Sequence, residues 1–319
     1  MMMPLSGMLT GKFGCRKVIG VFGFTMIVSL YLLAVAPSVA ALACSLLLFG
    51  AMLGGSEVAM NVQSVQVQNA FPRPVISSCH GFFSLGGVLG AGGMSALFAC
   101  GLSLNTAALA VVLFLALLML LSVCGALPYG QKSQGPLWVR PRGIVLLIGI
   151  LCFCVFLAEG AMLDWSGVFL IEQRGAPHSH AGWGYAAFSV TMTIGRLTGD
   201  RWVHTIGARA VVFVGAALGC AGYALAALLP WEWAGLAGFA LVGVGLSNVV
   251  PVFYVMTGKQ KEMPLSLAVA SVSTIGYLGI LAGPAIVGFV AQGTSLIFSF
   301  LLIALSLLAV ALIARVKFR

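Results

Sequence analysis

Long apolar stretches separated by short polar loops run through this whole chain. A membrane-spanning helix needs about 20 consecutive apolar residues. Ten segments have that length, at 18–36, 40–62, 80–101, 105–127, 144–171, 181–199, 208–229, 233–255, 265–290 and 293–314. Segment 181–199 is the least apolar, and the first dozen residues resemble the end of a further span. The pattern predicts an all-α, polytopic membrane protein.

Composition supports this prediction. The chain has 319 residues, of which 61% are hydrophobic and 7% charged, with a mean hydropathy of +1.11. Soluble domains carry about 25% charged residues. The eight cysteines are scattered, mostly in apolar runs, and indicate neither a disulfide framework nor a metal site. His178 and His180 have the spacing of only a weak metal clip, so no metal and no cofactor are expected.

The placement of the basic residues predicts the orientation of the chain. Alternate loops, starting with residues 12–17 and ending with the C-terminal tail, carry 15 of the 16 Lys and Arg residues, all except Arg174. Basic loops face the cytoplasm in inner-membrane proteins. We therefore expect a multi-pass protein of the cell inner membrane with a cytoplasmic C-terminus. The net charge of +9 is explained by this bias, without a nucleic-acid partner.

Three short patterns recur in the same order at an offset of about 190 residues. "GMLTG" (7–11) returns as "GRLTG" (195–199), "GGSE" (54–57) as "GLSN" (245–248), and "SLGGVLGAGG" (84–93) as "TIGYLGILAG" (274–283). The shared offset predicts two parallel structural repeats, an arrangement typical of one large class of transporters. We place the first helical bundle at 1–127, a polar cytoplasmic connector at 128–143 and the second bundle at 144–319.

The two loops "GMLTGKFGCRK" and "GRLTGDRWVHTIGAR" resemble the loop signature of the major facilitator superfamily. "GGSEVAMNVQ", "HGFFSLG" and "AEGAMLDW" are most similar to its YbjJ-like bacterial branch. The resemblance implies two helical bundles, transport of a small solute, a monomer, and a gating role for the loops. The gating residues are then Gly7, Gly11, Lys12, Gly14, Arg16, Gly195, Arg196, Gly199, Asp200, Arg201 and Arg209.

This sequence departs from the superfamily pattern in two ways. Gly11 stands where the first loop is expected to carry an acid, whereas Asp200 supplies an acid in the second loop. Furthermore, the chain begins at what resembles the end of the second helix. The expectation is a truncated first bundle that lacks the first helix and most of the second, on the order of 70–80 residues.

Acidic residues inside apolar spans are the sharpest candidates for function. An acid at a span centre costs about 2.5–3.5 kcal/mol on insertion scales. Glu159 lies about 22 Å from the cytoplasmic end of its span, and Asp164 lies about 30 Å in, near the far interface. We expect Glu159 to exchange a proton, bind a cation or hydrogen-bond a solute. The alternative is a structural pair with a neighbouring helix, and Asp164 has the further alternative of solvation.

Further polar residues share the spans. Glu57, Asn61, Ser64 and Gln68 follow helical spacing, so they form one stripe that either lines a solute path or joins helices. Asn248 matches Glu57 in the repeat and has the same two interpretations. His80 either relays protons or is an ordinary hydrogen-bonded histidine at a loop boundary.

Three classes of function remain. The first is a secondary transporter that moves a sugar, an organic acid or a drug-like solute by alternating access and is driven by protons through Glu159. No ATP-binding loop is present in the sequence. The alternative is a truncated, non-transporting relic or regulatory subunit. An intramembrane enzyme is not expected, because protease motifs are missing and the two aspartates are predicted at opposite membrane faces.

Overall fold

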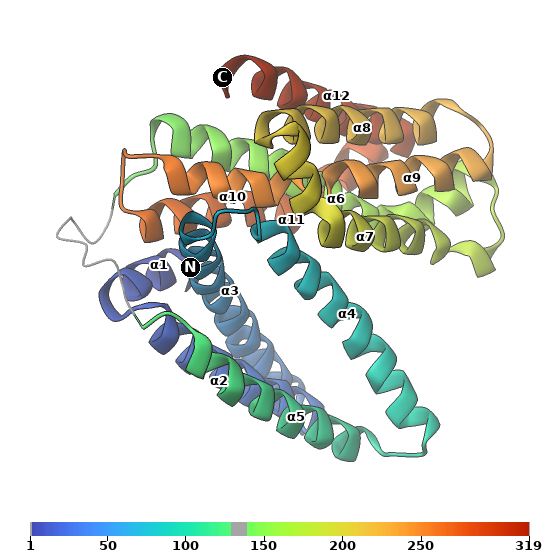
Figure 1. Cartoon of the computed structure of the whole chain (residues 1–319). Coiled ribbons are helices and arrows are strands. Elements are labelled where there is room, and N and C mark those ends of the chain that lie inside the picture. The colour runs from blue at the N-terminus through green and yellow to red at the C-terminus, as the bar shows by residue number, and fades with distance from the viewer. Residues whose placement is uncertain (1, 129–138, 319) are drawn as a thin grey trace. The chain divides into compact units, whose positions relative to one another are not determined.

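The computed structural model describes residues 2–128 and 139–318, and this part of the chain is helical with short connections (Figure 1). The helices are α1 (Met2–Phe13), α2 (Cys15–Ala34), α3 (Val39–Ala70), α4 (Ile76–Ala99), α5 (Leu104–Gly125), α6 (Gly143–Arg174), η1 (His178–His180), α7 (Trp183–Ile206), α8 (Ala208–Leu228), α9 (Glu232–Leu246), α10 (Val249–Lys259), α11 (Leu265–Gly293) and α12 (Leu296–Lys317). The predicted all-α fold is confirmed. Most of the predicted connector, with Lys132, and the terminal Arg319 lie outside the described residues.

Nine helical segments of the described chain are long and apolar enough to cross a membrane, with α9 and α10 together forming one of them. They coincide with nine of the ten predicted spans. The tenth, 181–199, is also a helix, α7, but it is less apolar because it carries Arg196, Asp200 and Arg201. Charged side chains at this density in a membrane helix require protein partners.

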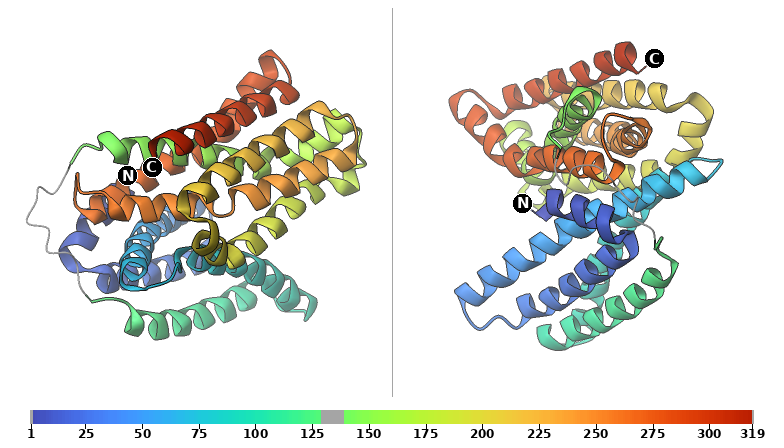
Figure 2. Two further views of the ribbon diagram at one scale, coloured as in Figure 1. Left: turned by 45° about the horizontal axis from the view of Figure 1, so that its top comes forward. Right: turned by 90° about the vertical axis from the view of Figure 1, so that its left-hand side faces the viewer.

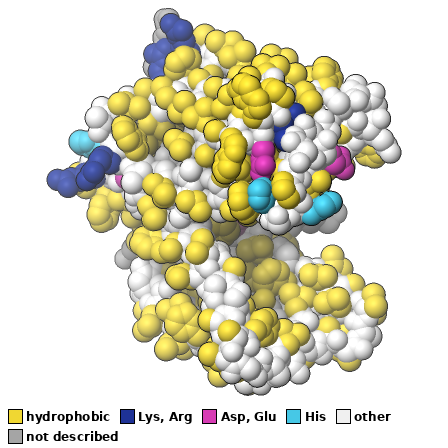
Figure 3. Space-filling view, turned by 90° about the vertical axis from the view of Figure 1, so that its right-hand side faces the viewer, with side chains coloured by type: hydrophobic (Ala, Val, Ile, Leu, Met, Phe, Trp, Pro, Cys, Tyr) yellow, Lys and Arg dark blue, Asp and Glu magenta, His cyan; other side chains and the backbone are white. Residues whose placement is uncertain are grey.

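The outer surfaces of the helices are apolar, as contact with lipid requires. Leu121 is 66% exposed and Phe289 is 75% exposed, which would be costly in water. Hydrophobic side chains cover much of the face shown in Figure 3. In lipid these side chains have a favourable environment, so the same exposure stabilises the protein within a bilayer.

The described residues form two compact units, each of which is seen from two further directions in Figure 2. The first contains residues 2–67, 85–128, 139–145 and 257–271. In it α2 packs along α5, and Gly20 and Gly23 of α2 allow the approach of Val123 and Met119 of α5. The Ser6 hydroxyl in α1 donates to the carbonyl of Gly55 in α3 at 2.5 Å, which joins these helices.

The second unit contains residues 68–84, 146–256 and 272–318, and its core is aromatic. Helix α8 packs against α9 and α12, and α7 packs against α9. Phe300 of α12 stacks on Phe169 of α6 with ring centroids 4.4 Å apart and meets the edge of Tyr223 of α8. Glycines at the α8–α9 crossing, Gly215, Gly222, Gly238 and Gly245, leave no room for a β-carbon. Small residues at such crossings are typical of helix packing in membranes.

Candidate functional site

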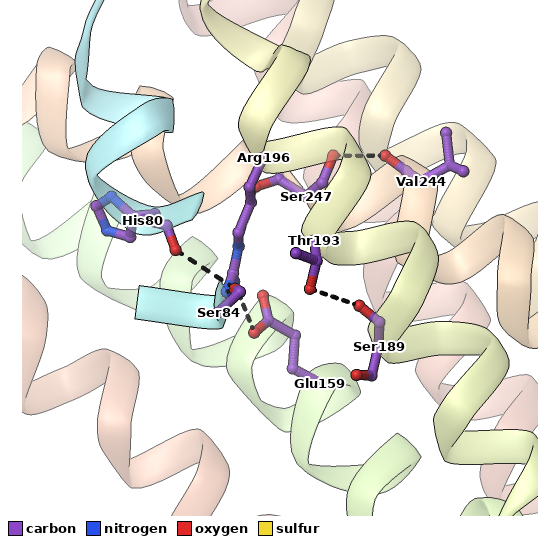
Figure 4. A network of polar contacts seen from close by, with 8 residues as sticks. All are labelled: His80, Ser84, Glu159, Ser189, Thr193, Arg196, Val244 and Ser247. Carbon is purple, nitrogen blue, oxygen red and sulfur yellow. Dashed lines mark hydrogen bonds and ion pairs between the residues drawn. The ribbon is translucent and has the colours of Figure 1, made fainter. Parts of the chain in front are cut away.

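A buried ion pair joins α6 and α7 within the second unit (Figure 4). Glu159 lies near the centre of the 32-residue helix α6. Its Oε2 atom accepts from the Nη2 atom of Arg196 in α7 at 3.3 Å. The side chains are 14% and 11% exposed, so both charges are largely removed from solvent. The pair explains how the apolar segment 144–171 tolerates an acid.

Arg196 extends the pair into a network that also reaches α4 and the α9–α10 junction. Its Nη1 atom donates to the Ser84 hydroxyl of α4 at 3.0 Å, and its Nε atom donates to the Ser247 carbonyl after α9 at 3.4 Å. The Ser84 hydroxyl in turn donates to the backbone carbonyl of His80 at 3.4 Å. Arg196 is therefore held by side-chain or backbone groups from α4, α6 and the α9–α10 junction (Figure 4).

Pro251 makes the Ser247 carbonyl available to Arg196. An α-helical carbonyl normally accepts from the N–H four residues later, and proline has no N–H and clashes with that carbonyl. Pro251 is four residues after Ser247, and the α-helix is interrupted at Ser247 and Asn248, between α9 and α10. The guanidinium of Arg196 takes the position of the missing donor.

Two glycines let α7 approach this interruption closely. A β-carbon at Gly195 would lie 2.5 Å from the Ser247 hydroxyl oxygen, and one at Gly199 would overlap the amide of Asn248. Asn248 donates from its Nδ2 atom to the Gly195 carbonyl at 2.9 Å. The glycines predicted as gating residues thus bring Arg196, three or fewer positions away, against α9 and α10.

The second oxygen of Glu159 is not matched by a donor. Its Oε1 atom is buried and has no hydrogen-bond partner among the described residues. His80 lies nearby on α4, where its Nδ1 atom is 3.0 Å from the Ile76 carbonyl and its ring stacks on Tyr254. Consequently, the pair retains hydrogen-bonding capacity that the described part of the fold does not satisfy.

Asp200, one turn after Arg196, binds the start of α4. Its two carboxylate oxygens accept from the backbone N–H groups of Ser77 and Ser78 at 3.0 and 2.9 Å, and the Ser78 hydroxyl also donates to it. A carboxylate at a helix N-terminus satisfies free N–H groups and complements the helix dipole. Asp200 and Arg196 thus attach α7 to α4 at two successive turns.

The two predicted gating loops have matching geometry at their ends. Gly14 and Gly207 have φ values of 87° and 83°, which favour glycine, and each directly precedes a helix. Arg16 donates to the carbonyls of Cys124 and Ala126 at the end of α5. Arg209 donates to the Arg315 carbonyl near the end of α12. Both arginines therefore satisfy helix C-terminal carbonyls.

The remaining predicted residues lie outside the ion-pair network. Asp164 is exposed at its helix surface, and Arg201 is exposed near the end of α7. Lys12 lies over the ring of Phe13. Gly7 and Gly11 of α1 face Ser266 and Ala270 of α11. Glu57 is half-buried and Asn61 is buried in α3, within the first unit.

The sequence pattern does not single out five further residues of the site, which are Ser84, Ser247, Pro251, Ser77 and Ser78. Serines are common in membrane helices and carry no distinctive spacing. Pro251 was the usable signal, because a proline inside an apolar run frees the carbonyl four residues earlier. Only the folded arrangement shows which side chain reaches that carbonyl.

Comparison with known proteins assigns the family. No family model matches the sequence. An uncharacterized MFS-type transporter of Yersinia pestis is 49% identical over 314 residues, which cover 98% of this chain and 82% of that protein. An uncharacterized transporter of Sinorhizobium fredii is 31% identical and covers 98% of this chain and 84% of its own length.

Solved structures show the same fold. The fucose:proton symporter of Escherichia coli superposes with a TM-score of 0.82 at 16% identity, covering 99% of this chain and 87% of the symporter. At that identity the likeness concerns the fold alone. The identity to the Yersinia protein establishes that this chain belongs to the major facilitator superfamily of transporters.

Proposed function

We propose that this protein is a proton-coupled secondary transporter that moves a small polar solute by alternating access, with Glu159 as the proton-binding group. The observation that carries the proposal is the buried ion pair between Glu159, near the centre of α6, and Arg196 of α7. The family membership supports transport, and a fold like that of a fucose:proton symporter is consistent with proton coupling.

Proton binding at Glu159 has a direct mechanical consequence. Neutral Glu159 no longer balances the charge of Arg196, so the ion pair weakens while the bonds from Arg196 to Ser84 and Ser247 remain. Arg196 is then able to change partners, and α6 is released from α7. We propose that this exchange of partners couples proton binding to the movement of the helices.

The proposal includes the orientation and subfamily expected from the sequence. Basic loops on one side favour the inner membrane with a cytoplasmic C-terminus. Under that orientation the Asp200 contacts with α4 lie toward the cytoplasmic side. The motif matches favour the YbjJ-like branch. We further propose that Asp200 acts as a gating residue, since its bonds to α4 must break if α4 and α7 separate during transport.

The role of Glu159 is tested by Glu159→Gln in proteoliposomes that contain a pH-sensitive dye. L-lactate and L-fucose are added outside, and protein-free liposomes supply the background. We expect one solute to drive proton entry with the wild-type protein, and at least a tenfold loss in Glu159→Gln because glutamine cannot exchange a proton at neutral pH.

Asp164→Asn is the matched control, because Asp164 lies on the same helix with an exposed side chain. It is expected to keep the wild-type rate. Proton entry through Glu159→Gln at the wild-type rate would show that Glu159 is not the coupling group. A wild-type protein that moves neither solute would favour the non-transporting alternative.

The Asp200 contact gives a second prediction. Asp200→Asn removes the negative charge at the start of α4 and leaves one oxygen to accept hydrogen bonds. Charged capping contributes about 1–2 kcal/mol, so the amides of Ser77 and Ser78 should exchange with solvent about 5–30 times faster. Hydrogen-exchange mass spectrometry of the wild type and the variant measures this directly.

The start of α5 is the internal control for that experiment. The Ser103 hydroxyl there accepts from the Thr106 N–H, far in sequence from Asp200. The Thr106 amide should exchange with solvent at the same rate in the wild type and in Asp200→Asn. Equal exchange at Ser77 and Ser78 in the wild type and in Asp200→Asn would contradict the capping role.

A further inference from the structure

The guanidinium of Arg196 has more donors than its described partners use. An arginine carries five N–H groups. Among the described residues, three of them meet Ser247, Ser84 and Glu159. On the other side of the pair, the Oε1 atom of Glu159 is buried without a donor. The pair therefore has unused donors and an unused acceptor.

Charge balance restricts how this pair exchanges partners. An uncompensated charge in a low-dielectric interior costs several kcal/mol. Within the part of the chain that the structure describes, Glu159 is the carboxylate bonded to Arg196. Asp200 is on the same helix, but both of its oxygens are engaged at the start of α4. Arg196 is consequently released from Glu159 at low cost only when another anion takes its place.

The other groups around Glu159 do not provide that anion. On α8, the Tyr223 hydroxyl donates to the Ala158 carbonyl at 2.6 Å. On α4, His80 is bonded to the Ile76 carbonyl through its Nδ1 atom. Helix α11 packs on α6 through Ile275, Gly276 and Ile280, which are apolar, and through Tyr277, whose ring meets Phe156. On α6 itself, Cys152 is a buried free thiol.

We propose that the transported solute is a small organic anion whose carboxylate replaces Glu159 on Arg196 while Glu159 holds a proton. This inference rests on the proposed function and specifies its substrate class. A carboxylate matches the planar guanidinium and accepts two parallel hydrogen bonds from it. The Ser84 hydroxyl is already bonded to Arg196, so it lies beside the position where the two carboxylates exchange. There it is available to a polar group of the solute.

The exchange is balanced in charge and in protons. The solute brings one negative charge, the proton adds one positive charge, and the Glu159 carboxylate becomes a neutral carboxylic acid. The site has the same net charge before and after. Each carboxylate is therefore accompanied by one proton, and uptake of a monocarboxylate is electroneutral.

The proposal is tested by offering the site a free carboxylate. Glu159→Ala removes the internal anion and leaves Arg196 unpaired. Acetate is the probe, and acetamide is its neutral isostere, at equal concentration and constant ionic strength in chloride. We expect acetate to raise the apparent melting temperature of detergent-solubilised Glu159→Ala saturably, by about 2–4 °C, while acetamide has no effect.

Three further variants make the result specific. Glu159→Gln keeps more of the side-chain volume and should give the same response if Glu159→Ala folds poorly. Asp164→Ala removes an exposed acid from the same helix and should show no acetate response. Glu159→Ala combined with Arg196→Gln should lose the response. No acetate effect in either Glu159 variant, or an undiminished effect without Arg196, would overturn the proposal.

The acetate experiment and the proton-entry experiment test the two proposals separately. Acetate protection together with normal proton entry in Glu159→Gln would refute proton coupling through Glu159 and retain the anion site. Loss of proton entry in Glu159→Gln without any acetate protection would retain the coupling and refute the carboxylate substrate. In the wild type, lactate uptake that changes with an imposed membrane potential would overturn the electroneutral exchange.

Discussion

Replacing Arg196 with glutamine is expected to lower the stability of the protein by about 3–5 kcal/mol, because it leaves the carboxylate of Glu159 buried without its cation. The substitution also removes the charged donors to Ser84 and Ser247 that attach α7 to its neighbours. The apparent melting temperature in detergent, followed by intrinsic fluorescence, measures the loss.

A double substitution separates the cost of the unpaired charge from the cost of the lost donors. In Glu159→Gln with Arg196→Gln neither charge is buried, so much of the stability should return. Arg201→Gln, which removes an exposed arginine from the same helix, is the control and should change stability by less than about 0.5 kcal/mol. If Arg196→Gln were as stable as Arg201→Gln, the ion pair would not contribute to the stability of the protein.

The second large effect is expected from adding a single methyl group to α7. Gly199→Ala places a β-carbon where it overlaps the Asn248 amide, and both helix backbones are constrained by neighbouring contacts. Overpacking of this kind costs about 1–3 kcal/mol. It should also displace Arg196 and Asp200, which flank this position, so solute-driven proton entry should fall at least tenfold.

Shortening the facing side chain tests whether the overlap is the cause. Gly199→Ala combined with Asn248→Ala should recover stability and part of the activity, because the smaller residue makes room for the methyl group. Gly182→Ala, at the start of α7 where a β-carbon meets no neighbour within 4 Å, should leave both unchanged. A fully active, stable Gly199→Ala protein would contradict the close approach of α7 to the α9–α10 junction.

The two loops show which structural features a local sequence pattern predicts and which depend on helix packing. The recurrence of the loop signature predicted equivalent loops, and Gly14 and Gly207 share a positive φ before a helix. The gating role of their arginines stays a prediction, and in the structure Arg16 and Arg209 bind carbonyls at the ends of α5 and α12. A loop pattern indicates a turn geometry, but the partner of a long side chain depends on which helix ends beside it.

The division of the chain into bundles at 1–127 and 144–319 stays a prediction. The compact units of the structure group residues 68–84 with the second unit and residues 257–271 with the first. In the second unit this grouping has a clear origin, since Asp200 and Arg196 bind Ser77, Ser78 and Ser84. Hydrogen bonds between residues more than 100 positions apart leave no periodic trace in a sequence.

The sequence by itself determined the membrane environment, the helical class and the position of the key acid. The length of an apolar run and the insertion cost of a carboxylate are local properties. Both can therefore be read from the residues around Glu159 without knowing which helices pack beside them. Tertiary structure alone decided that Arg196 is its partner and that Arg196 reaches the Ser247 carbonyl, which Pro251 leaves free. A buried charge is satisfied by whatever the fold brings within hydrogen-bonding distance, and that choice depends on how the helices pack.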